Sequence, residues 1–309
     1  MNEDELYTST LVYGGPGVGK TTYAVSAFWD WTNRQLVGNG KFITLGREDN
    51  PALMVPEECR QLSSGKSLRL GSPSLDSLQW AEDFDKLVTG LLVSAKKGET
   101  LDALVIDGMS EFDLLYEHIF ARKNIGDGDK FAKWDALLRQ MFATMQRLDP
   151  QALKCNIIVT ARVMEKRQAK ESSRSSIPGD PDFMNFDYYP SMRGSFKYHL
   201  PHYFNLVLYM ETEQRLVTGG PYAGRRLPVH VLNMVRTGKF YVKNQWENEW
   251  LRSGERLQLM NPSFHDVYSK LVNMNNRGEL GENIDPGDFE LDTDIEGGME
   301  NASVTTVEV

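Results

Sequence analysis

A glycine-rich stretch near the amino terminus contains the residues whose chemistry is most specific. Glycines lack side chains, so the backbone N–H groups of such a stretch can turn inward around a phosphate. A following lysine can reach the β- and γ-phosphates, and a following hydroxyl can ligate Mg²⁺. The stretch consists of Gly14, Gly15, Pro16, Gly17, Val18, Gly19, Lys20 and Thr21, with Thr22 next. We therefore expect this stretch to bind a nucleoside triphosphate, with Thr21 at the metal.

The segments on either side of this stretch have the pattern that a phosphate-binding loop requires. Residues 11–13 are a short apolar run that predicts a strand, and residues 22–36 predict a helix. The amino terminus of a helix presents unpaired N–H groups and the positive end of its dipole to an anion. The context therefore favours a phosphate loop over an ordinary glycine-rich turn.

A second apolar run ends in a carboxylate. The run Leu104-Val105-Ile106 precedes Asp107. In an open α/β sheet, ligands bind beyond the carboxyl ends of the parallel strands. Asp107 is therefore the candidate to hold Mg²⁺ beside Thr21, and the alternative is an aspartate that only caps the next helix.

Hydrolysis also needs a group that orients the attacking water. Glu48 follows the predicted strand at 42–45, and Glu111 lies four residues beyond Asp107. The residue directly after Asp107 is Gly108 and not a glutamate, which favours Glu48 after the neighbouring predicted strand. Glu111, Asp49 and a charge cluster that is only solvated stay open as alternatives. Thr160 and Arg162, at the end of the predicted strand 157–159, are further candidates that would sense the γ-phosphate.

The order of elements predicts the fold class. Apolar runs alternate with helical patterns through the first two thirds of the chain, which indicates an α/β fold with a mostly parallel sheet flanked by helices. From residue 205 onward, close-spaced strand patterns predict an antiparallel extension, followed by a helix at 264–274. The predicted strands are 11–13, 42–45, 67–70, 104–106, 157–159, 206–210, 215–217, 229–235 and 240–242, and the predicted earlier helices are 22–36, 75–95, 109–123 and 130–148.

The charge of the chain is unevenly distributed. The 309 residues have a formal net charge of −9, but residues 279–309 hold ten acids and no lysine or arginine, which leaves +1 for residues 1–278. We expect an ATPase domain at 1–276 and a disordered acidic tail at 277–309. The tail either only solvates the chain, or competes with nucleic acid for a basic segment, or docks on a partner protein.

Composition also bears on location. The first residues are acidic, and no run approaches the ~18 apolar residues that would cross a bilayer. The two cysteines, Cys59 and Cys155, are expected to be separate thiols in a reducing cytoplasm. The five histidines do not form a metal-ligand pattern.

Taken in order, these motifs resemble RecA-like P-loop ATPases, and among them the phage-encoded recombination ATPases of the single-strand-annealing type. The resemblance covers roughly residues 8–250. It rests on the phosphate loop, the strand 42–43 leading to Glu48, the Leu-Val-Ile-Asp run at 104–107, the strand 157–160 with the long segment after it, and Val242-Lys243-Asn244-Gln245.

The resemblance implies hydrolysis of ATP to ADP and phosphate with Mg²⁺, stimulated by DNA, and assembly into a homo-oligomeric ring or filament. It implies that Lys243 reaches the nucleotide of the next subunit and that residues 163–200 face single-stranded DNA. Basic side chains can track phosphates while aromatic rings stack on bases. The candidate DNA-binding residues are Lys166, Arg167, Lys170, Arg174, Arg193 and Lys197.

Two other functions fit the same loop. One is a helicase or packaging-type motor, which an unwinding assay would reveal. The other is a non-catalytic, nucleotide-gated adaptor that binds protein. For the annealing function, the acidic tail is the candidate contact for a single-strand-binding or other recombination protein.

Overall fold

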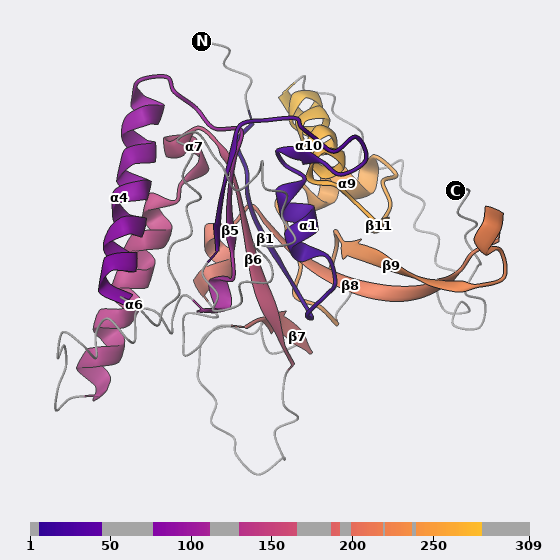
Figure 1. The fold of residues 1–309 in the computed structure, drawn as a ribbon, viewed down its shortest axis with the longest axis horizontal. Coiled ribbons are helices and arrows are strands. Elements are labelled where there is room, and N and C mark those ends of the chain that lie inside the picture. Colours follow the sequence, from indigo (N-terminus) through magenta and orange to yellow (C-terminus); the bar gives the residue numbers. More distant parts are fainter. Residues whose placement is uncertain are drawn as a thin grey trace, which may run out of the picture.

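The fold is described from a computed structural model of the chain (Figure 1). The structure describes residues 6–44, 77–111, 130–165, 187–191, 199–218, 220–236 and 239–279. None of the helices within these ranges is long and apolar enough to span a bilayer.

The centre of the molecule is a mixed sheet in the order β11-β9-β8-β1-β6-β5-β4. Neighbours from β8 to β4 are parallel, whereas β9 and β11 add antiparallel strands at the other edge. Two short strands lie off this path, with β10 on β8 and β7 on β6. The strands are β1 Ser9–Gly14, β4 Gly40–Thr44, β5 Ala103–Asp107, β6 Asn156–Glu165, β7 Tyr188–Pro190, β8 Leu206–Leu216, β9 Arg226–Asn233, β10 Lys243–Asn244 and β11 Gln258–Met260. The predicted fold class, including the antiparallel extension, is confirmed.

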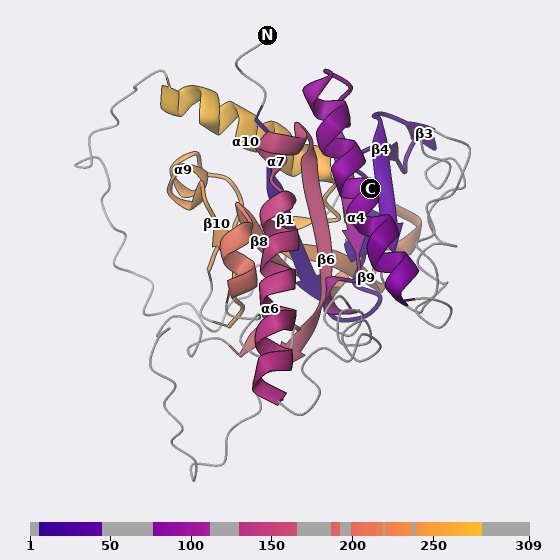
Figure 2. The same ribbon diagram turned by 90° about the vertical axis from the view of Figure 1, so that its left-hand side faces the viewer.

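Helices cover both faces of this sheet. Figures 1 and 2 show α4 and α6 on one face, and α1 and α10 on the other. Every residue of β1 and β5 is buried, as expected for parallel strands covered on both sides. The helices are α1 Lys20–Val25, α4 Ser77–Lys96, α6 Lys130–Arg147, α7 Pro150–Leu153, α9 Glu247–Arg252 and α10 Phe264–Glu279, and the 3₁₀ turns are Met109–Glu111, Leu200–Tyr203 and Gly220–Tyr222.

The first helix is shorter than the sequence predicts. α1 ends at Val25, and the prediction of a helix to residue 36 is wrong. Residues 29–36 instead form a hairpin of β2 Trp29–Asp30 and β3 Gln35–Leu36. Its turn is closed by Asp30, whose carboxylate Oδ1 accepts from the backbone N–H groups of Thr32 at 2.8 Å and Asn33 at 3.1 Å. An aspartate that bonds the backbone this way competes with helix formation.

The strand β8 is longer than predicted. The expected separate strands at 206–210 and 215–217 form one strand, which pairs with β9 as far as Leu216 opposite Arg226. Pairing with β1 ends at Met210. The six further residues extend the β8–β9 ribbon by about 20 Å beyond its pairing with β1. Figure 1 shows the ribbon projecting from the rest of the sheet. Long-range pairing therefore overrides the local break in hydrophobicity.

The other predicted elements have mixed outcomes. The strands near residues 42, 104 and 157 and the helices near 75–95, 130–148 and 264–274 are present within a few residues. The predicted helix 109–123 is a 3₁₀ turn over its first three residues, and its remainder lies outside the described residues, as do the strand 67–70 and residues 280–309 of the tail. The predicted strand 240–242 is reduced to a single bridge at Phe240, and the strand β10 follows it.

Candidate nucleotide-binding site

The phosphate loop connects β1 to α1, as its sequence requires. Gly17 has φ +73° and Gly19, which caps α1, has φ +91°. Residues other than glycine rarely adopt a backbone conformation with positive φ. Gly14 is constrained differently, because a Cβ built on it would lie 2.1 Å from the carbonyl oxygen of Met210 in β8. The glycines of the pattern are therefore needed for both the turn and the close approach of two strands.

A Gly14→Ala variant should consequently lose stability. The backbone of β8 cannot move away without breaking its pairing with β1, so we expect a loss of about 2–3 kcal/mol in the free energy of unfolding. Gly90→Ala is the matched control, since that site in α4 has no atom within 4 Å of the added Cβ and should gain about 0.5–1 kcal/mol. Urea denaturation measures both, and equal stabilities of Gly14→Ala and wild type would contradict the close approach.

Lys20 lies folded over the loop. Its Nζ donates to the carbonyl oxygens of Gly14 at 3.0 Å and Gly15 at 2.5 Å. Burial lowers the pKa of Lys20 below its usual value; the charge of Asp107 opposes this shift, and that of Arg162 adds to it. The ammonium group is thus held at the loop, where an anionic phosphate would offset the cost of its burial.

Asp107 and Thr21 come together at the carboxyl ends of β5 and β1. The Thr21 hydroxyl donates to Asp107 Oδ2 at 2.9 Å, and Asp107 is 8% exposed. The hydroxyl and carboxylate are hard oxygen ligands, the kind that Mg²⁺ prefers. The donor set therefore fits the metal predicted from the sequence, with Thr21 and Asp107 as the residues that would hold it.

Thr160 lies on β6, between β1 and β5, and has a role that the sequence did not suggest. Its hydroxyl donates to Asp107 Oδ1 and accepts from the backbone N–H of Gly108 at 3.1 Å. The contact orients the carboxylate from the strand that separates β1 from β5. Thr160 is therefore a positioning residue for Asp107 in this structure, and its predicted contact with a γ-phosphate stays a prediction.

Removal of this hydroxyl should weaken metal use. Groups that orient a metal ligand typically contribute about tenfold or more to metal affinity, so Thr160→Val should raise the Mg²⁺ concentration needed for half-maximal turnover about tenfold. Thr160→Ser keeps the hydroxyl and should restore the wild-type requirement. A Mg²⁺ titration of ATP hydrolysis tests this, and an unchanged midpoint for Thr160→Val would contradict it.

Arg162 lies next to the loop. Its position in β6 pairs with Gly14 in β1, and its backbone N–H donates to the Ser110 hydroxyl at 2.8 Å. The side chain is exposed at the carboxyl edge of the sheet. The structure therefore brings Arg162 to the edge of the sheet where the phosphates would bind, and its contact with the γ-phosphate stays a prediction.

Lys243 lies on β10, away from the carboxyl ends of the parallel strands. It pairs with Val207, which pairs with Leu11 near the middle of β1. Its Nζ donates to the carbonyl oxygens of Phe204 at 2.6 Å and Pro201 at 3.4 Å, and burial followed by the charge of Arg236 lowers its pKa. Within its own chain Lys243 is separate from the phosphate loop, and its role across a subunit interface stays a prediction.

The remaining predicted residues cannot be placed at the site. Glu48 and Asp49 lie outside the described residues, and the structure describes the backbone of Glu111 in the turn after Asp107 but not its side chain. The six candidate DNA-binding residues Lys166, Arg167, Lys170, Arg174, Arg193 and Lys197 also lie outside the described residues. The choice of water-orienting group therefore stays as open as in the sequence.

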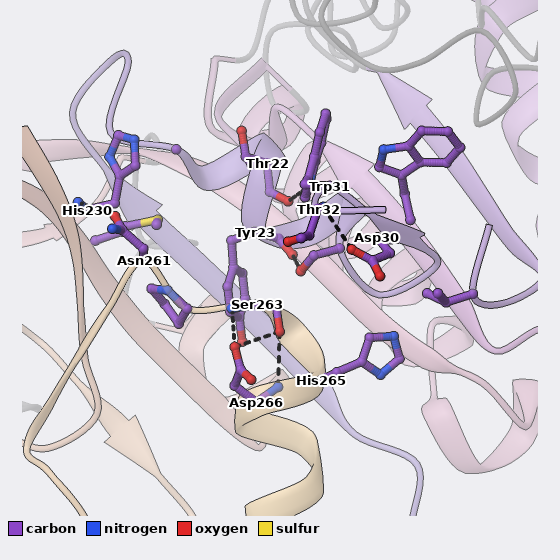
Figure 3. Close-up of a pocket in the computed structure, with 16 residues that line it drawn as sticks. Thr22, Tyr23, Asp30, Trp31, Thr32, His230, Asn261, Ser263, His265 and Asp266 are labelled. Atoms are coloured by element: carbon purple, nitrogen blue, oxygen red, sulfur yellow. Dashed lines mark hydrogen bonds between the residues drawn. The ribbon is translucent and has the colours of Figure 1, made fainter. Parts of the chain in front are cut away.

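A cavity of about 550 Å³ adjoins the loop on the other side of α1, and the sequence did not predict it (Figure 3). It is bounded by α1, the β2–β3 hairpin, His230 of β9 and the start of α10. The imidazole of His230 lies over the loop, since a Cβ on Gly19 would be 3.2 Å from its ring. More than 200 residues separate Gly19 from His230, so no local signal could have found this contact.

Comparison with known families agrees with this geometry. A family model described as an AAA domain matches residues 7–246, which is most of the chain. The chain belongs to the AAA-domain family. The AAA match and the loop together make it a P-loop NTPase of the ATPase-like kind, and the matched range contains the phosphate loop, Asp107, Thr160 and Lys243. Among curated proteins, none matches this sequence.

Proposed function

We propose that this AAA domain is an ATP- and Mg²⁺-dependent ATPase that binds single-stranded DNA and acts in phage recombination or strand annealing. The observation that carries the nucleotide part is the convergence of Lys20, Thr21 and Asp107 at the end of β1 and β5. Bound Mg²⁺ would supply charge neutralisation at the β- and γ-phosphates. The lysine would add a fixed positive charge, and Thr160 would keep the carboxylate oriented.

The DNA part is supported by the sequence that comes after β6. This strand passes beside Gly14 and ends at Glu165, which pairs with Tyr188 of β7. The intervening sequence begins with the basic residues Lys166, Arg167, Lys170 and Arg174. The sequence between these two strands therefore begins and ends beside neighbouring strands, one of which contacts the site through Thr160 and Arg162. Binding or loss of the γ-phosphate near Thr160 and Arg162 would therefore act only a few residues before the basic residues that start at Lys166.

Measurement of ATP hydrolysis with and without single-stranded DNA, at two salt concentrations, tests the proposal. We expect DNA to stimulate phosphate release, and the stimulation to fall as salt rises because phosphate contacts release counterions. Phosphate release that ignores DNA at both salts would leave an ATPase without the proposed partner. Phosphate release at background with and without DNA would favour the non-catalytic adaptor.

Substitution of the basic residues Lys166, Arg167, Lys170 and Arg174 is expected to weaken DNA binding and to leave ATP hydrolysis in the absence of DNA unchanged. A variant with Lys166, Arg167, Lys170 and Arg174 all changed to glutamine should bind DNA more weakly and show a slope of log affinity against log salt that is less steep by about 3, since single-strand contacts contribute ~0.7 each. Exposed Arg139 and Arg252 offer a control pair on the helices α6 and α9. Equal slopes for the segment variant and wild type would contradict the assignment.

A further inference from the structure

The part of the chain that contains the β8–β9 ribbon is positively charged. Residues 214–246 hold six basic residues and no acid, although the whole chain has a formal net charge of −9. Four of these basic side chains have partners in the structure, namely a carboxylate, an aromatic ring or a backbone carbonyl, and they are Arg215, Arg236, Lys239 and Lys243. The other two are Arg225 and Arg226, which lie together at the tip of the ribbon.

The two arginines at the tip are available to a ligand. Both are exposed, and no acid in the described part of the chain forms an ion pair with either of them. The acids Glu211 and Glu213 lie closer to the sheet, and Glu213 is paired with Arg215 at 2.8 Å. A guanidinium group can donate two parallel hydrogen bonds to a phosphate. The tip therefore presents two groups that suit a phosphate backbone.

The same tip exposes two large side chains with apolar surface. Tyr222 is 51% exposed and Leu216 is 44% exposed, and neither belongs to the hydrophobic core. Leu216 is the ladder partner of Arg226, so these two side chains share one face of the ribbon. An exposed tyrosine ring next to arginines is a surface on which an unpaired base can stack.

Hydrogen bonds give the tip a defined backbone conformation. The N–H of Val217 donates to the carbonyl oxygen of Arg225 at 2.9 Å, and the N–H of Gly224 donates to that of Val217 at 2.8 Å. The N–H of Arg225 donates to the carbonyl oxygen of Tyr222 at 3.0 Å. The backbone that carries the ring and the two guanidinium groups is thus ordered before any ligand binds, which lowers the entropy cost of binding.

The ribbon also connects the tip to the phosphate loop (Figure 1). The imidazole of His230 lies over Gly19, and His230 is on the same strand as Arg226, four residues further along β9. Side chains four residues apart in a strand lie on the same face. A strand of nucleic acid bound at the tip is therefore held by the element that borders the nucleotide site.

We propose that the tip of the β8–β9 ribbon is a second contact for single-stranded DNA, in which Arg225 and Arg226 bind backbone phosphates and Tyr222 stacks on an unpaired base. Acidic protein surfaces would also attract the arginines, but the exposed ring favours a ligand that combines negative charge with flat bases. The inference rests on the proposed function, because it assigns a further contact to the same strand. It is separate from the basic residues that start at Lys166.

Binding of a labelled oligothymidylate at a series of salt concentrations tests the two parts of the contact. Arg225→Gln combined with Arg226→Gln should weaken binding and make the slope of log affinity against log salt less steep by about 1.4, since single-strand phosphate contacts contribute ~0.7 each. Tyr222→Ala should weaken binding at least about fivefold and leave the slope unchanged, whereas Tyr222→Phe keeps the ring and should retain most of the affinity.

A matched pair of arginines away from the ribbon is the control. Arg252 and Arg256 are exposed on and after α9, and their double change to glutamine should leave the slope as in wild type. The substituted side chains at the tip are exposed, so the tip variants should keep the melting temperature and the sedimentation coefficient of the DNA-free wild-type protein.

The outcomes separate this proposal from the proposed function. If wild-type protein binds the oligonucleotide and both the double arginine variant and Tyr222→Ala bind it with unchanged affinity and slope, the ribbon contact alone is overturned. Wild-type protein that binds no oligonucleotide overturns the proposed function as well. Tip variants that change the sedimentation of the DNA-free protein but not its DNA affinity also overturn the proposal, because the ribbon would then be a contact between copies of the chain.

Discussion

Replacement of Lys20 by alanine should lower the rate of ATP hydrolysis by at least about 100-fold, the typical effect of losing one donor aimed at developing charge. In the structure the ammonium group is buried at the loop and bonds the carbonyl oxygens of Gly14 and Gly15. The variant removes the positive charge that would face the β- and γ-phosphates but leaves the backbone of the loop in place. Steady-state phosphate release at saturating ATP and Mg²⁺ measures the effect.

A lysine remote from the site is the control for this variant. Lys96 is an exposed residue in the last turn of α4, and Lys96→Ala should hydrolyse ATP at the wild-type rate. Both variants should keep the wild-type melting temperature within a few degrees, which excludes unfolding as the cause of lost turnover. Undiminished hydrolysis by Lys20→Ala would refute the site assignment.

Conversion of Asp107 to asparagine should abolish Mg²⁺-dependent hydrolysis to a similar extent. The change is nearly isosteric, but it removes the negative charge that would hold the metal and replaces one acceptor with a donor. In the wild-type structure the hydroxyls of Thr21 and Thr160 both donate to the carboxylate, so the amide N–H of the new asparagine would face a group that also donates. We expect loss of at least about 100-fold in turnover, with ATP binding in the absence of Mg²⁺ retained.

Asp102→Asn provides a matched control from the other end of the same strand. Asp102 immediately precedes β5, and its Oδ2 accepts from the backbone N–H of Asn39 at 2.6 Å. The same chemical change there should cost some stability and leave the Mg²⁺ dependence of hydrolysis as in wild type. If Asp102→Asn and Asp107→Asn lost activity equally, the effect would be one of folding rather than of metal binding.

The nucleotide site and the edge elements differ in how far the sequence determined them. The phosphate loop is a local motif, in which residue spacing and the glycines at Gly17 and Gly19 define the backbone with no distant help. Asp107 was predictable from one further rule, that parallel strands bring their carboxyl ends to one edge. The alternation of strands and helices was likewise sufficient for the fold class.

Other features depended on contacts that no local pattern contains. The length of β8 is decided by its pairing with β9. Thr160 contacts Asp107 because β6 lies between β1 and β5, and the sequence did not predict this contact. The end of α1 is an exception, because the Asp30 turn and the pairing of Trp29 with Leu36 lie close to the helix in the sequence.

The cavity illustrates the same division. The cavity is lined by Gly19, Trp31 and His230, which belong to three separate segments. The local sequence around each of these residues does not predict a cavity. The sequence by itself determined that this chain has a phosphate loop with a carboxylate at the same edge of the sheet, because the loop is a local motif and parallel strands bring their carboxyl ends to one edge. The tertiary structure alone decided what surrounds that loop, because strand order and register are set by the burial of the whole sheet.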